Sequence, residues 1–150
     1  MFVEPPATIA VLGGGPIGLE AALYGRYLGY HVELFERGTV AENVLQWGHV
    51  RMFSPFKMNA SPLGLRALSA QDESYRPPAA DALLTGRQYA EDYLLPLSQS
   101  DLLIDGLHEQ SRIIAVSRQK YRKGDLVGDP ARANSPFRLL VEDKSGQRNV

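Results

Sequence analysis

Hydrophobic and polar residues first alternate over Thr8–Leu12, where Ile9 and Val11 occupy every second position. A period of two predicts a strand with these side chains on its buried face. Beyond a run of glycines, apolar residues recur at helical spacing, at Ile17, Ala21, Tyr24 and Leu28. This spacing predicts a helix that buries the stripe and stops at Gly29, because glycine readily adopts the left-handed conformation found after a helix.

A second alternating segment runs from His31 to Glu36 and places Val32 and Leu34 on one side. It predicts a second strand, so residues 8–36 form a strand, a glycine turn, a helix and a strand. We therefore predict an α/β fold with a parallel, Rossmann-type sheet.

Residues 38–80 show no sustained period, and prolines at 55, 62, 77 and 78 interrupt them. A long segment of this kind inside a compact domain is usually functional or disordered. Aromatic and apolar residues are plentiful up to about Leu68, which favours an ordered lining. We expect short helical turns at 42–47 and 62–69, followed by an exposed loop over 69–80.

A further helix is expected after Thr85, because Thr85 and Gln88 have the form of a capping box. Tyr89 and Tyr93 supply its apolar side, and Pro96 limits its length. Beyond it, Leu102–Ile104 is expected to form a short strand.

The last third of the chain predicts a β-hairpin or meander. Arg112–Val116 is a good strand candidate, and Phe137, Leu139 and Val141 alternate cleanly as another. A hairpin turn is expected at 144–147, and a returning strand begins at Arg148. An arm this short would leave the preceding strand incompletely paired.

Three glycines, Gly13, Gly15 and Gly18, follow the first strand with the spacing G-x-G-x-x-G. The first permits a sharp turn, the second lets a pyrophosphate approach the backbone, and the third lets the helix pack close to the sheet. Pro16 suits the first helical turn, where its missing N–H is no loss. The free N–H groups of this helix start, which includes Ile17, would hold the phosphates together with the helix dipole.

Glu36 ends the second strand, at the distance from the glycines where an acidic residue binds the hydroxyls of an adenosine ribose. A carboxylate there would repel a 2′-phosphate, which argues against NADP but does not separate NAD from FAD. Three alternatives stay open. They are a glycine-rich turn of another α/β domain, an NAD-binding dehydrogenase domain, and a non-catalytic module that holds a dinucleotide.

The composition of the chain further limits the binding partners and the chemistry that are expected of it. The 150 residues suffice for one modest core, and a net charge of −1 implies no broad attraction to nucleic acid or to an anionic membrane. The chain has no cysteine, which excludes disulfides, thiolate metal ligands and a thiol nucleophile. Its three histidines lie too far apart in the sequence for a local metal motif. We expect a cytoplasmic protein that has no metal site.

Residues 8–36 resemble the FAD-binding fingerprint of flavoproteins with two dinucleotide-binding domains. In that family the three glycines are followed by two further small-residue positions, which Ala22 and Gly29 fill here. Two later segments, Trp47–Phe56 and Thr85–Leu97, look like parts of bacterial flavoproteins related to the flavin-containing monooxygenases.

The resemblance implies FAD as cofactor, NAD(P)H as its reductant and a monooxygenase-like reaction on a small molecule. It also implies two further cofactor-binding positions. Arg37 would lie along the adenine, and the strand containing Ile113 would offer backbone hydrogen bonds to the adenine ring.

The same resemblance predicts that residues 1–150 are the N-terminal part of an FAD/NAD(P)-binding domain within a longer protein. No second glycine fingerprint for the nicotinamide cofactor follows in this sequence. We expect the chain alone to be marginally stable, to bind FAD weakly and not to be a competent oxidoreductase.

Overall fold

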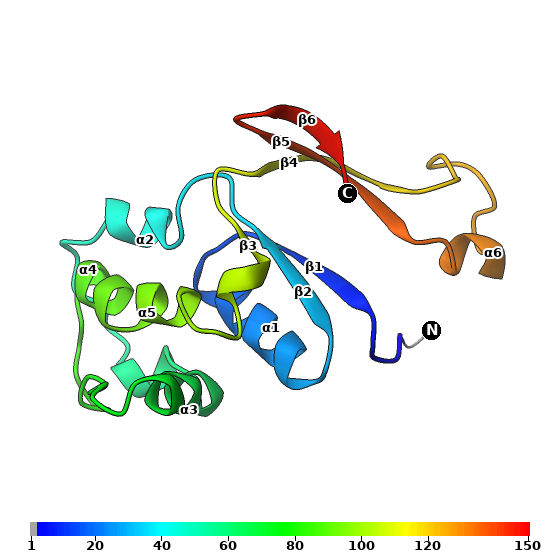
Figure 1. Cartoon of the computed structure of the whole chain (residues 1–150). Helices are drawn as coiled ribbons and strands as arrows, with labels where there is room; N and C mark the ends of the chain where they lie inside the picture. The colour runs from blue at the N-terminus through cyan, green and yellow to red at the C-terminus, as the bar shows by residue number, and fades with distance from the viewer. Residues whose placement is uncertain (1–2) are drawn as a thin grey trace.

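The computed structural model describes residues 3–150 (Figure 1). Its strands are β1 (Thr8–Leu12), β2 (His31–Phe35), β3 (Leu107–His108), β4 (Arg112–Arg118), β5 (Phe137–Asp143) and β6 (Gly146–Asn149). Its helices are α1 (Pro16–Tyr27), α2 (Glu42–Gln46), α3 (Pro62–Gln71), α4 (Gly86–Tyr89), α5 (Leu95–Ser98) and α6 (Pro130–Ala133). Three further helical pieces are the 3₁₀ turn η1 (Phe56–Met58), the π-helical turn η2 (Ala90–Leu94) and the 3₁₀ turn η3 (Ile104–Gly106).

The strands form two sheets, which confirms the α/β prediction with a parallel sheet and a late antiparallel meander. In the first sheet β1 and β3 both pair in parallel with β2, and in the second β5 lies antiparallel between β4 and β6. Successive strand side chains point to opposite faces. Val32 and Leu34 therefore pack into the helical core, whereas Phe35 packs against Leu139 and Val141 of the antiparallel sheet.

Helix α1 buries a different face from the one predicted. Ile17, Ala21, Tyr24 and Leu28 are all exposed, with 81% of Ile17 accessible, and Leu19, Ala22 and Leu23 are buried instead. The reason is close approach: a Cβ on Gly18 would overlap the Gly13 carbonyl oxygen, and one on Gly25 would lie 2.9 Å from Val32 Cγ2. The small residues must face the sheet, which turns the bulky stripe outward.

Two expectations for the middle of the chain are also wrong. Pro96 does not end its helix, because the π-helical turn η2 precedes it and the Leu95 N–H donates to the Ala90 carbonyl, one residue further back than in an α-helix. Leu102–Ile104 is not a strand. A 3₁₀ turn over Ile104–Gly106 brings the chain beside β2, and the strand β3 starts at Leu107.

The late hairpin is better paired than its sequence predicts. The returning strand begins at Gly146, two residues before the expected start, and Val150 continues its pairing through two hydrogen bonds with Leu139, of 2.7 and 3.0 Å. On this edge of β5 the pairing covers residues 139–143 and leaves Phe137 and Arg138 without a partner from the returning strand, while β4 pairs with the other edge of β5.

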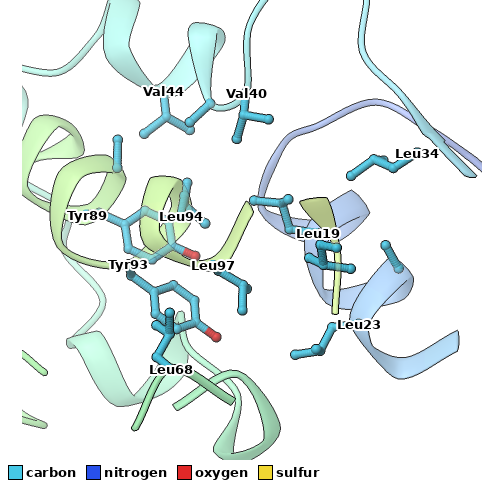
Figure 2. Packing of buried hydrophobic residues seen from close by; sticks show 14 of the residues in the cluster. Leu19, Leu23, Leu34, Val40, Val44, Leu68, Tyr89, Tyr93, Leu94 and Leu97 are labelled. Atoms are coloured by element: carbon cyan, nitrogen blue, oxygen red, sulfur yellow. The ribbon is translucent and has the colours of Figure 1, made fainter. Parts of the chain in front are cut away.

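The helical core contains a buried polar junction between α1, α3 and the helix after Thr85. Figure 2 shows Tyr93 lying close to Leu68 and Leu97. The Tyr93 hydroxyl donates to Glu20 and accepts from the Ser61 N–H at 3.1 Å. Burial raises the pKa of the Tyr93 phenol, and its hydrogen bond to Glu20 raises that pKa further.

We expect Tyr93→Phe to lower the free energy of unfolding by about 1–3 kcal/mol, because the partly buried Ser61 N–H and Glu20 carboxylate lose this hydrogen-bond partner. Since an unfolded tyrosine ionises near pH 10 and the folded phenol ionises only at higher pH, the wild-type contribution is complete below about pH 10 and declines above it. Thermal unfolding followed by circular dichroism across this range should show a steeper alkaline decline for wild type than for Tyr93→Phe. An equal alkaline decline in the melting temperatures of wild type and Tyr93→Phe would contradict a stabilising role for the Tyr93 hydroxyl.

Candidate dinucleotide-binding site

The glycine turn joins the carboxyl end of β1 to the start of α1. Gly13 has a φ of +110°, a conformation that favours glycine, and its N–H donates to the Phe35 carbonyl at 2.8 Å. Gly18 packs directly on Gly13, whereas a Cβ on Gly15 would meet no heavy atom within 4 Å. The first and third glycines therefore shape the turn, and the second keeps open space above it.

The start of α1 presents free amide groups beside that space. Pro16 occupies the first helical turn, and no acceptor among residues 3–150 pairs with the N–H groups of Gly15, Ile17 or Gly18. These donors sit at the positive end of a twelve-residue helix. Such an arrangement binds a phosphate through backbone N–H groups, and the exposed Ile17 side chain takes no part in it.

Glu36 lies directly under the turn. One carboxylate oxygen accepts from the Gly14 N–H at 2.6 Å, and the other accepts from the Gly38 N–H at 2.8 Å. The backbone of Glu36 is fixed as well, because its N–H donates to the His108 carbonyl at 2.9 Å. The carboxylate is therefore held in one orientation at the carboxyl end of β2.

Gly14 is a positioning residue that the sequence did not single out. A Cβ there would lie 3.1 Å from Glu36 Cβ and 3.3 Å from Val40 Cγ2, while the Gly14 carbonyl accepts from the Ala41 N–H at 3.1 Å. It occupies a variable place in G-x-G-x-x-G, so the motif itself gives no signal for it.

A cleft of about 510 Å³ opens at this end of the two sheets. It brings together Gly13, the adjacent residues Glu36 and Arg37, and Ile113, which come from three distant parts of the sequence. Gly15, Pro16, Ile17 and Gly18 do not line the cleft itself but continue the turn that begins at Gly13. Several other residues that line the cleft were not identified from the sequence: Leu12, Phe35, Asn43, Ser111, Arg112, Ile114, Ala115 and Val116.

Hydrogen bonds between two loops fix the outer wall of the cleft. The Ser111 N–H donates to the Glu36 carbonyl at 2.8 Å, and the Gln110 N–H donates to the Gly38 carbonyl at 2.9 Å. The Glu109 carboxylate accepts from the Val40 N–H at 2.6 Å. Gln110 has a φ of +53°, which is uncommon outside glycine and marks this loop as held by its surroundings.

The parallel sheet, the glycine turn and the packed antiparallel sheet define an α/β fold of the Rossmann type. Solved structures of several enzymes share this fold. The chain is similar to the bacillithiol disulfide reductase Bdr (YpdA) of Bacillus cereus, at a TM-score of 0.62 and 16% identity over 95% of this chain and 36% of that one. It is also similar to the lysine monooxygenase NbtG of Nocardia farcinica. That match has a TM-score of 0.61 and 16% identity, and it covers 96% of this chain and 41% of NbtG.

A third structure, OTEMO in complex with FAD and NADP, matches at a TM-score of 0.58 and 14% identity over 99% of this chain and 24% of that one. The chain thus spans less than half the length of each of these proteins. No protein-family model and no curated protein matches the sequence. Among residues 3–150, every helix is too short or too polar to span a lipid bilayer.

Proposed function

We propose that this chain binds the adenosine diphosphate half of FAD. The observation that carries the proposal is the meeting of Gly13, Glu36, Arg37 and Ile113 in one cleft beside the free amides of α1. In this arrangement the pyrophosphate lies over Gly15 and the start of α1, and the adenosine ribose faces Glu36. The adenine then lies between Arg37 and the strand that contains Ile113.

We further propose that the chain is part of a cytoplasmic, NAD(P)H-dependent, monooxygenase-like flavoprotein that acts on a small molecule. Bound FAD would supply the redox chemistry, and the residues of this chain bind and orient it. The presence of FAD and NADP in the OTEMO structure supports this pair of cofactors. The proposal assigns no acid or base to the chain.

An NAD-binding dehydrogenase domain uses the same βαβ unit and is the main alternative. FAD is favoured by Ala22 and Gly29 in the extended fingerprint and by the antiparallel sheet that packs on Phe35. The test is to purify the protein, record its absorbance spectrum and identify the released cofactor by chromatography. A flavin spectrum with FAD released on denaturation supports the proposal, and NAD in its place contradicts it.

The lack of cysteine leads to a separate prediction about the reaction. One structural neighbour is a disulfide reductase, but this chain contains no thiol that could exchange with a disulfide substrate. We expect the chain supplied with FAD and NADPH to leave a disulfide substrate unreduced, as measured by free thiol released over time. Thiol release above that of a protein-free control would overturn the prediction.

A further inference from the structure

A second cleft, of about 590 Å³, adjoins the first. It is lined by Arg37, Gly38, Thr39, Glu42, Gln110 and Arg112. Arg37 and Arg112 line both clefts, so these two residues stand at the boundary between the two. Arg37 follows β2 and Arg112 begins β4, so only the fold brings them together.

Backbone hydrogen bonds hold the segments that carry these two arginines, while their guanidinium groups have no hydrogen-bond or ion-pair partner within residues 3–150. The hydrogen bonds from Gln110 to Gly38 and from Ser111 to Glu36 join the two segments side by side. Within residues 3–150, neither guanidinium donates a hydrogen bond or forms an ion pair. Glu142, which faces Arg112 across the strand pair, accepts instead from the Gln147 amide at 3.0 Å.

The surrounding charges favour an uncharged ligand over an anion. Glu42 lines the second cleft together with both arginines, and Glu109 directly follows β3 at the start of the loop that carries Gln110, so this part of the fold holds two carboxylates as well as two guanidinium groups. A guanidinium group can instead stack on the face of an aromatic ring, and an adenine offers such a face to each of two cations.

We propose that Arg112 is a second adenine-binding guanidinium, which contacts the ring from the side opposite Arg37. This inference rests on the proposed function, because it requires the adenosine of the dinucleotide in the first cleft. It makes Arg112 a specificity-determining residue: it contributes to binding of FAD and ADP, which carry adenine, and not to binding of FMN, which does not.

The test compares wild type with Arg112→Lys, which keeps the charge and removes the planar group. Dissociation constants for FAD, ADP and FMN are measured by isothermal titration calorimetry. We expect Arg112→Lys to raise the dissociation constants for FAD and ADP by the same factor, about tenfold, and to leave any FMN binding unchanged. Because the Arg112 side chain is exposed and unpaired, the melting temperature without nucleotide should not change.

Arg138→Lys is the matched control, since Arg138 is an exposed β5 arginine outside both clefts. If FAD binds to wild type and Glu36→Arg weakens it, but Arg112→Lys leaves the FAD and ADP constants unchanged, the inference is wrong and the proposed function stands. If wild type binds neither FAD nor ADP, both are wrong. An equal loss in Arg138→Lys would also overturn the inference, since it would show an effect of overall surface chemistry.

Discussion

Gly18→Ala is expected to lower the free energy of unfolding by about 3 kcal/mol, the upper part of the usual cost of overpacking. The added Cβ would overlap the carbonyl oxygen of Gly13, which is backbone and cannot rotate away. Relief requires the end of β1 and the start of α1 to separate, which also removes the phosphate-binding geometry. Urea unfolding followed by circular dichroism measures the loss, and FAD titration should show that binding is lost with it.

Gly15→Ala is the matched control for this substitution. Gly15 has a φ of −82°, which alanine adopts without strain, and a Cβ there meets no heavy atom within 4 Å. We therefore expect wild-type stability with FAD binding weakened at least about tenfold, since the methyl group lies where the pyrophosphate approaches the backbone. Destabilisation equal to that of Gly18→Ala would show that the two glycines do not have these separate roles.

Glu36→Arg is expected to weaken FAD binding by about a hundredfold, because two charge-assisted hydrogen bonds to the ribose hydroxyls are lost. The structure adds a second cost, since the same carboxylate holds the N–H groups of Gly14 and Gly38. Glu36→Gln, which keeps one carbonyl oxygen as an acceptor, should bind FAD with intermediate affinity. Fluorescence titration with FAD measures all three proteins, and an unchanged affinity in Glu36→Arg would remove Glu36 from the site.

Local requirements explain which features could be predicted from the sequence. The turn at Gly13, the helix stop at Gly29 and the capping box at Thr85 each depend on a few neighbouring residues, and the structure confirms all three. The buried face of α1 could not be predicted in the same way. Apolar spacing shows a stripe, but the side that faces the sheet is decided by which residues are small enough for close contact, here Gly18, Ala22 and Gly25.

The outer wall of the cleft depends on contacts between distant parts of the chain. The hydrogen bond from the Val40 N–H to the Glu109 carboxylate joins residues that are 69 positions apart, and no local sequence pattern predicts it. For the same reason Asn43 and Arg112 were missed as lining residues. Arg37 and Ile113 were named only through the family resemblance, and the structure places both in the cleft, where their contact with a cofactor remains a prediction.

The most direct test of the central claim is a competition experiment at the glycine turn. The protein is dialysed to equilibrium against FAD, and increasing concentrations of ADP or FMN are then added. If the chain binds FAD through its adenosine diphosphate half, ADP displaces FAD completely, FMN does not, and Glu36→Arg retains little FAD from the start. Displacement by FMN but not by ADP, or FAD retention that is unaffected by Glu36→Arg, would contradict the account.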